Sequence, residues 1–186
     1  NNFNNWKGTS DSETLIQAID IWGIEKTLKK INGMFSFSIW NRQSKSLYLA
    51  RDRFGEKPLY YSWIPQNASF VFGSDLIFDK LFKNIKFELN DEALNDLLHL
   101  NYINNNYSIF KNVYKLDPGC YSEIHFKKNQ LPKINIQKYW KLENINYKKN
   151  NLNHIESINQ LDIKLSNVVK NQIFADVGVG TFLSGG

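Results

Sequence analysis

The sequence predicts an α+β fold followed by the beginning of a second, α/β unit. Two observations support the first prediction: apolar residues recur at helical spacing within 10–30, and apolar and polar residues then alternate between 33 and 75. The second prediction comes from an amphipathic stretch at 154–173 and a β-type run at 177–183. The polar, Asn- and Lys-rich stretch 141–153 should link the two units.

The first expected helix begins at Ser10, which is followed three positions later by Glu13. This spacing is that of a capping box, in which each of the two side chains accepts a hydrogen bond from the other residue's backbone amide. Gly23 should end the helix. A short second helix is expected over 25–30.

Four strands are expected between 33 and 75, joined as an antiparallel meander. Their sequences are "GMFSFSIW", "SLYLARD", "LYYSW" and "SFVFGSD". The charged turn "RDRFGEKP" at 51–58 separates the second strand from the third. We interpret its charged side chains as local ion pairs that hold a hairpin end, rather than as catalytic groups.

The second half of the chain should contain two further helices and several short strands. One helix is capped by Asn90, and a turn at Pro118-Gly119 interrupts the short strands that follow. The helix at 154–173 should bury its apolar side chains, which are Ile155, Ile158, Leu161, Leu165, Val168 and Val169. Val177–Leu183 should form a buried strand.

The composition argues against a membrane protein and against a nucleic-acid partner. The formal net charge is +5, but the lysines are dispersed rather than gathered in a stripe or block. No apolar run reaches the roughly 18 residues of a membrane helix. Cys120 is the single cysteine, so no intrachain disulfide can form, and it lacks metal-ligand spacing with the three histidines. We expect a cytoplasmic protein without a structural metal.

Three motifs each have two interpretations. Asp11, in "SDSE", either stabilises the first helical turn or binds a ligand's ammonium group. "LSGG" at 183–186 is either an ordinary connection after a strand or the start of a loop whose backbone N–H groups bind an anion. Cys120 is either a nucleophile, which requires a lowered thiol pKa, or a half-buried structural residue, which we favour because no histidine or helix start adjoins it. Taken alone, each motif favours the structural interpretation.

Taken together, "NGMFSFSIW", "RDRFGEKPLYY", "FVFGSD", "KYW" and "GTFLSGG" resemble the glutamine-hydrolysing asparagine synthetases in order and spacing. The resemblance extends from Trp6 over nearly the whole chain. It implies that 1–140 is an αββα sandwich of the N-terminal-nucleophile, class II glutaminase type, without its N-terminal part. It also implies that 154–186 begins an α/β ATP-pyrophosphatase domain. Because the chain starts at Asn1 and ends on Gly-Gly, we expect an internal fragment, inactive by itself.

The resemblance implies a two-site reaction. A cysteine at the mature N-terminus, outside this chain, attacks the glutamine amide with its own α-amine as the base. Ammonia then reaches a second site, where ATP and Mg²⁺ activate the side-chain carboxylate of aspartate as an acyl-adenylate. Asparagine, glutamate, AMP and pyrophosphate are the products. The expected partners are glutamine, aspartate and ATP, and a homodimer is one assembly to test.

Few functional positions of the family fall within this chain, and none is catalytic. Asp11 matches the aspartate that binds the α-amino group of glutamine through a charge-assisted contact. Phe182, Ser184, Gly185 and Gly186 match the loop that binds ATP, with phenylalanine in place of the usual leucine.

Some positions depart from the family pattern: Gly178 replaces a common proline, Asp75 a usual glutamate and Cys120 a common histidine. They indicate a divergent member, and one alternative is an amidotransferase that acts on another carboxylate in surface-polysaccharide biosynthesis. A second alternative is a relative without activity that serves as a scaffold. A third, a sugar-phosphate aminating enzyme, is disfavoured by "FLSGG" after the linker.

Overall fold

The computed structural model describes residues 7–8, 10–82, 85–104, 106–127, 130–144, 152–173, 175 and 177–182. The chain divides into two compact units, Asn1–Asn144 and Ile145–Gly186.

Two helices begin the first unit, α1 (Asp11–Trp22) and α2 (Ile24–Lys30). The Ser10 hydroxyl caps α1 by accepting a hydrogen bond from the Ser12 amide at 3.2 Å. Gly23 ends α1 with a φ of 77°, as predicted, and its amide donates to the Ile19 carbonyl.

The predicted capping box at the start of α1 is wrong. The Glu13 carboxylate accepts hydrogen bonds from the backbone amides of Lys7 and Gly8, at 3.0 and 2.8 Å, rather than from that of Ser10. The preceding segment folds back far enough for its own amides to reach this carboxylate first. The two acceptors therefore have separate tasks, because Ser10 caps the helix and Glu13 anchors the segment before it.

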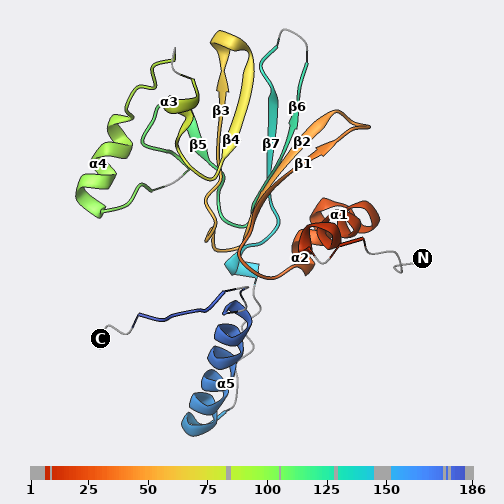
Figure 1. Ribbon diagram of the computed structural model, residues 1–186. Coiled ribbons are helices and arrows are strands. Elements are labelled where there is room, and N and C mark those ends of the chain that lie inside the picture. Colours follow the sequence, from red (N-terminus) through yellow and green to blue (C-terminus); the bar gives the residue numbers. More distant parts are fainter. Residues whose placement is uncertain are drawn as a thin grey trace. The chain divides into compact units, whose positions relative to one another are not determined.

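In the described part of the first unit, seven strands form two antiparallel sheets (Figure 1). The four-stranded sheet has the order β1-β2-β6-β7 and the three-stranded sheet the order β4-β3-β5. The strands are β1 (Ser36–Asn41), β2 (Ser46–Arg51), β3 (Tyr60–Ile64), β4 (Ser69–Gly73), β5 (Val113–Lys115), β6 (Cys120–His125) and β7 (Lys133–Lys138).

The predicted meander is therefore wrong, although its four strands are present. They form two hairpins, β1-β2 and β3-β4, in different sheets. The free edge of β2 pairs with β6, which follows about 70 residues later, with Leu49 opposite Ser122. The 51–58 turn thus carries the chain from one sheet to the other.

The main core lies between the two sheets. Leu49 of β2 and Ile124 of β6 are fully buried in one cluster with Tyr61 of β3. On the opposite face of the four-stranded sheet, Leu28 of α2 packs with Tyr121 in a second cluster. Successive residues of β2 are buried on both faces because both are covered. The described layers are helix, sheet and sheet, a mixed α/β architecture with antiparallel sheets.

Two buried charged residues hold the turn between the sheets. The Arg51 guanidinium donates to the carbonyls of Lys57, Leu116 and Gly55 at 2.8, 2.6 and 2.5 Å. The Asp52 carboxylate, 1% exposed, accepts from three backbone amides of the same turn at 3.0 to 3.1 Å. These two residues hold the turn, as predicted, but they do so through hydrogen bonds with backbone groups and not through the expected ion pairs.

Further short elements complete the first unit. Asn90 caps α4 (Asp91–Leu100) by accepting from the amides of Glu92 and Ala93, as predicted. The remaining elements are α3 (Phe78–Leu81) and the 3₁₀ turns Pro65–Asn67 and Leu142–Asn144. Cys120 is 4% exposed in the core between the sheets, more deeply buried than expected.

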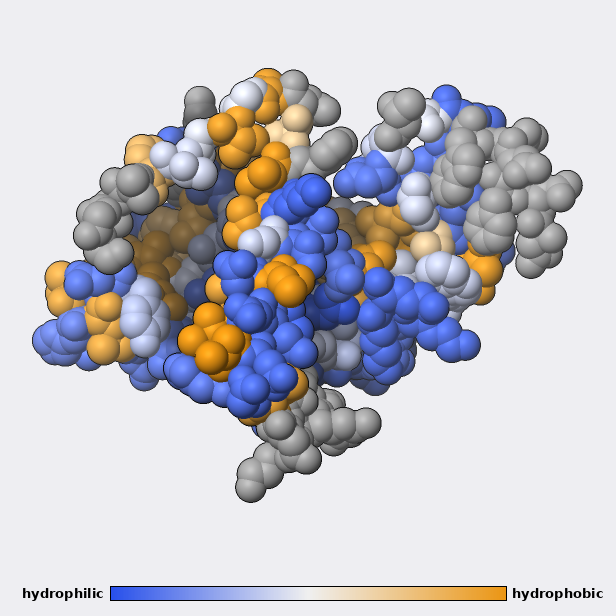
Figure 2. Space-filling model, turned by 90° about the horizontal axis from the view of Figure 1, so that it is seen from below, coloured by the Kyte–Doolittle hydropathy of each residue, from blue (hydrophilic) through white to orange (hydrophobic). Residues whose placement is uncertain are grey.

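The second unit contains one described helix, α5 (His154–Gln172), which begins with a capping box between Asn153 and Glu156. The prediction that its apolar residues point inward is wrong for the described chain. All six are at least half exposed, from 52% for Ile158 and Val168 to 71% for Ile155. An amphipathic pattern identifies an apolar face but not the segment that covers it. Figure 2 shows hydrophobic side chains open to solvent on the face it presents.

The predicted buried strand at 177–183 is also absent from its described part, 177–182. Val177 is 77% exposed, and no described segment pairs with this stretch. A β-type sequence forms a strand only beside a neighbour that satisfies its backbone groups. Among the described residues, no helix has both the length and the hydropathy needed to cross a bilayer.

Candidate functional site

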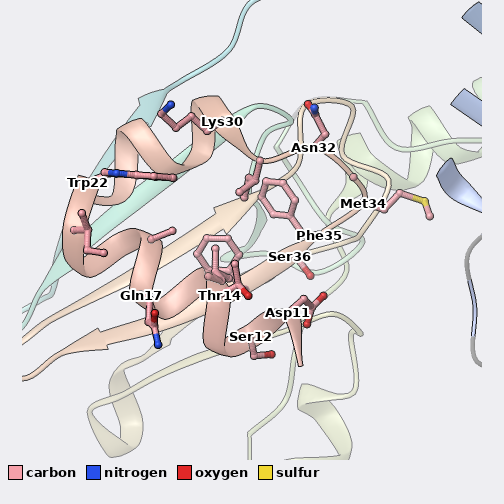
Figure 3. A pocket seen from close by; sticks show the side chains of 16 residues that line it. Asp11, Ser12, Thr14, Gln17, Trp22, Lys30, Asn32, Met34, Phe35 and Ser36 are labelled. Atoms are coloured by element: carbon pink, nitrogen blue, oxygen red, sulfur yellow. The ribbon is translucent and has the colours of Figure 1, made fainter. Parts of the chain in front are cut away.

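A cleft of about 810 Å³ opens in the first unit between α1 and the segment 30–37, which joins α2 to β1. Figure 3 shows Asp11 and Ser12 at one end of the cleft and Trp22 and Lys30 at the other. Residues 11, 15, 18 and 22 of α1 all line it. Their spacing of three to four residues places them on one face of the helix.

Asp11 gives the cleft a carboxylate whose oxygens are available to a ligand. It is exposed at the first position of α1, where the helix dipole favours a negative charge. Its one hydrogen bond in the described chain is a long one, 3.5 Å from the Ser10 hydroxyl. No lysine or arginine of the described chain forms an ion pair with it. The arrangement can accept a cation.

Glu13 stands two positions away and is not available in the same way. Both of its oxygens accept backbone amides of the preceding segment. These hydrogen bonds, from Lys7 first and then from Gly8, lower the pKa of Glu13 below its usual value. Of the two carboxylates in "SDSE", only that of Asp11 lines the cleft.

The rest of the lining is partly apolar and partly polar. Phe35 and Phe37 stack with ring centroids 5.5 Å apart, and Leu15 and Ala18 face the cleft from α1. At the far end, the Lys30 ammonium lies 5.0 Å from the centre of the Trp22 ring. Hydrogen-bonding side chains are supplied by Thr14, Gln17, Asn32 and Ser36. Such a lining suits a small amphipathic molecule with an ammonium group.

Arg53 fixes the wall of the cleft from outside. Its guanidinium donates to the side-chain oxygen of Asn32 and, at 3.1 Å, to the carbonyl of Lys29. The backbone amide of Asp52 donates to the carbonyl of Phe35 at 2.9 Å. The turn between the sheets therefore positions the segment that forms one side of the cleft.

The described cleft can bind but contains no activated nucleophile. Its hydroxyl groups come from Ser12, Thr14 and Ser36, and no histidine or cysteine lines it. Cys120 lies in the core, where burial first and the Asp117 charge second raise the pKa of its thiol. Cys120 is therefore structural, because a raised pKa keeps the thiol protonated.

Of the second group of predicted site residues, the structure describes Phe182 alone. Phe182 is fully exposed, and Ser184, Gly185 and Gly186 lie outside the described residues. Asp11 and Phe182 belong to different units.

The residues that sequence reasoning missed are those of the 30–37 segment, Asn32, Phe35 and Ser36 above all. No local signal marks them, because their place beside α1 depends on the packing of α2 and on the contacts of Arg53. The helix face shared by Asp11, Leu15 and Ala18 could have been found, since its spacing is visible in the sequence.

Comparison with known proteins now adds to this geometry. Residues 1–140 match the glutamine amidotransferase domain family. The chain is 30% identical to asparagine synthetase [glutamine-hydrolyzing] 3 of Bacillus subtilis (strain 168), over 96% of this chain and 27% of the relative. It is 33% identical to a putative asparagine synthetase [glutamine-hydrolyzing] 2 of Methanocaldococcus jannaschii, over 95% of this chain and 33% of the relative.

A third relative is named differently. The amidase chyE of Penicillium rubens is 30% identical over 96% of this chain and 25% of its own length. The chain thus spans about a quarter to a third of the length of the curated relatives it matches. Since the family match covers residues 1–140, the chain belongs to the glutamine amidotransferase domain family, with glutamine-hydrolysing asparagine synthetases among its homologues.

Proposed function

We propose that the cleft beside α1 binds glutamine and that the intact protein transfers the amide nitrogen to aspartate, forming asparagine. The observation that carries this proposal is the exposed Asp11 carboxylate, which lines a partly apolar cleft in a glutamine amidotransferase domain. An ammonium–carboxylate hydrogen bond is roughly twice as strong as a neutral one, so Asp11 would orient the ligand.

The other residues of the cleft fit the remaining parts of glutamine. The methylene groups would lie against Leu15 and Phe35, where removal from water is favourable by about 0.8 kcal/mol for each buried CH₂. Hydrogen-bonding side chains such as Asn32 and Ser36 could receive the carboxylate or the amide. This chain binds and orients the substrate in our proposal, and the attacking thiolate comes from a segment that precedes it.

The finer fold assignment is also a proposal. The helix, sheet and sheet layers agree with three of the four layers of an αββα sandwich. We propose that the second unit begins an ATP-pyrophosphatase domain with Phe182, Ser184, Gly185 and Gly186 at its nucleotide loop. That proposal rests on the sequence resemblance, because Phe182 is fully exposed. Among the described residues, no three His, Cys, Asp or Glu side chains lie together as they would around a metal ion.

The test is to incubate the intact protein with glutamine labelled with ¹⁵N in the side-chain amide, together with ATP, Mg²⁺ and aspartate. We expect ¹⁵N-labelled asparagine by mass spectrometry, and no product when ATP is left out. Labelled ammonia without labelled asparagine would confirm the glutaminase and reject aspartate as the acceptor. Neither product would leave the protein as a scaffold without activity.

One observation favours a second acceptor, a carboxylate other than that of aspartate: the sequence departs from the family pattern at Asp75, Cys120 and Gly178. If aspartate fails while ammonia is released, carboxylated amino sugars from surface polysaccharides are the next acceptors to assay. Incorporation of ¹⁵N into one of them would assign the protein to this alternative.

A further inference from the structure

A second cleft in the first unit, separate from the one beside α1, is strongly cationic. Its volume is about 470 Å³. The five positively charged residues that line it are Arg51, Arg53, Lys115, Lys138 and Lys141. Two carboxylates, Asp117 and Glu143, also line it, so the cleft keeps a formal excess of three positive charges. The proposed glutamine chemistry makes no use of it.

The two arginines of this cleft use several of their N–H donors to hold the protein's own backbone and side chains, and they add positive charge to the wall. Arg51 donates to three backbone carbonyls, and Arg53 donates to Asn32 and Lys29. Both guanidinium groups are therefore fixed in place. Their positive charge stays in the wall of the cleft and acts on whatever enters it.

The three lysines keep donors for a ligand. Lys115 Nζ makes one hydrogen bond, to the Ile103 carbonyl at 3.3 Å, which leaves two of its three N–H groups. Lys138 and Lys141 are exposed. In the described part of the chain, none of the three forms an ion pair with a carboxylate.

The cations of the cleft outnumber its two carboxylates, five to two. Burial first, and then the nearby Arg51 charge, lower the pKa of Lys115, and Asp117 opposes this only in part. Lys138 and Lys141 both act on the same buried thiol, that of Cys120, which places their charges in one neighbourhood. Like charges held close together on a concave surface favour the entry of an anion.

The backbone beneath the cleft is firmly held. The amides of Tyr139 and Trp140 both donate to the Gly119 carbonyl, and a Cβ at Gly119 would lie 2.9 Å from the Trp140 carbonyl oxygen. The Trp140 ring packs against Phe54, with centroids 5.2 Å apart. The backbone between the lysines at 138 and 141 is therefore held by hydrogen bonds and packing, which keeps the bases of both side chains beside the cleft.

We propose that this cleft binds a multivalent oxyanion of the phosphoryl class, held by the ammonium groups of Lys115, Lys138 and Lys141. Lysine binds phosphate as a point charge, and clustered lysines suit an anion with several negative charges. A nucleic acid fits less well, because its backbone requires a stripe of cations and here they are confined to one cleft that also contains Asp117 and Glu143.

The test is a calorimetric titration of the intact protein with inorganic pyrophosphate at low ionic strength, with inorganic phosphate as the less charged comparison. The cleft variant is Lys138→Gln with Lys141→Gln. The control is Lys127→Gln with Lys133→Gln, which removes the same charge from exposed positions elsewhere on the first unit. Circular dichroism verifies that both variants fold.

We expect a saturable site for pyrophosphate that is weakened at least ~10-fold, or about 1.4 kcal/mol, in the cleft variant, because two ammonium donors to the anion are removed. The control variant should retain it. Equal weakening in both variants would show general charge attraction and overturn the proposal, as would no saturable binding. Failure of glutamine to bind would reject the proposed function but leave this result unchanged.

Discussion

At the scale of single residues, neighbouring carboxylates have different tasks because they have different partners. The Glu13 carboxylate accepts hydrogen bonds from two backbone amides, and the buried Asp52 carboxylate accepts from three. The Asp11 carboxylate lines a cleft. The type of side chain does not distinguish these three roles. They are distinguished by the number of hydrogen-bond donors that reach each carboxylate.

Replacement of Asp52 by alanine should destabilise the first unit by about 2–4 kcal/mol, because three part-buried hydrogen bonds from backbone amides to its carboxylate would be lost. Asp52→Asn should cost less, since its amide oxygen can still accept from Phe54 and Glu56 while its NH₂ group faces the Lys57 amide. The measurement is the free energy of unfolding in urea. Asp75→Ala is the control, because its exposed carboxylate accepts a single adjacent amide. Equal losses for Asp52→Ala and Asp75→Ala would contradict this account.

Ionisation of the buried Tyr61 hydroxyl should make the protein less stable in alkaline solution. Burial raises the pKa of Tyr61 to about 12 from a usual value near 10. Between these pH values the folded protein keeps a phenol proton that the unfolded chain loses. The contribution of this proton to the free energy of unfolding is therefore fully present below pH 10. It falls by at most about 1.4 kcal/mol per pH unit as the pH rises toward 12.

Tyr61→Phe should reduce the loss of stability between pH 9 and pH 11 by about 1 kcal/mol relative to the wild type. Urea denaturation at the two pH values measures this difference. Tyr102→Phe, at a residue that is 57% exposed, is the matched control for removal of a phenol. If Tyr61→Phe loses as much stability between pH 9 and pH 11 as the wild type, the Tyr61 hydroxyl does not titrate in this range.

At the scale of elements, the sequence predicted best those features that depend on neighbours in the chain. Ser10, Gly23 and Asn90 mark helix ends through hydrogen bonds that span four residues or fewer. The single meander failed because the partner of β2 is β6, and no local pattern identifies that pairing. The prediction that the apolar face of α5 is buried failed for the same reason, because an amphipathic pattern does not identify the segment that would cover that face.

The segment between α2 and β1 should depend on Arg53 for its order. Arg53→Ala removes the donors to Asn32 and to the Lys29 carbonyl, so amide hydrogen exchange in 30–35 should become faster. The Michaelis constant for glutamine should rise several-fold, with a smaller effect on turnover. Arg42→Ala, in the exposed turn between β1 and β2, is the control. Unchanged exchange in 30–35 would show that Arg53 does not hold this wall.

At the scale of the whole molecule, the family and the α+β class could be predicted from sequence, because several separated motifs agree. The cleft could not, since it is built from Asp11 and from a segment about 20 residues later whose position depends on α2 and Arg53. The proposed second site, with Phe182 and Ser184 to Gly186, stays a prediction. Its test is the ATP requirement of asparagine formation in the intact protein.

The central claim is that the Asp11 carboxylate binds the α-ammonium group of glutamine. The most direct measurement is calorimetric binding of glutamine and of glutaramate, which lacks the amino group, to the intact wild-type protein and to Asp11→Asn. Asp20→Asn, on the same helix but outside this cleft, is the control.

We predict that Asp11→Asn weakens glutamine binding by about 10- to 100-fold, the range expected for a hydrogen bond to a charged group. The same variant should change glutaramate binding by less than about threefold, and Asp20→Asn should affect neither ligand. Equal weakening of both ligands in Asp11→Asn, or unchanged binding of glutamine, would contradict the account.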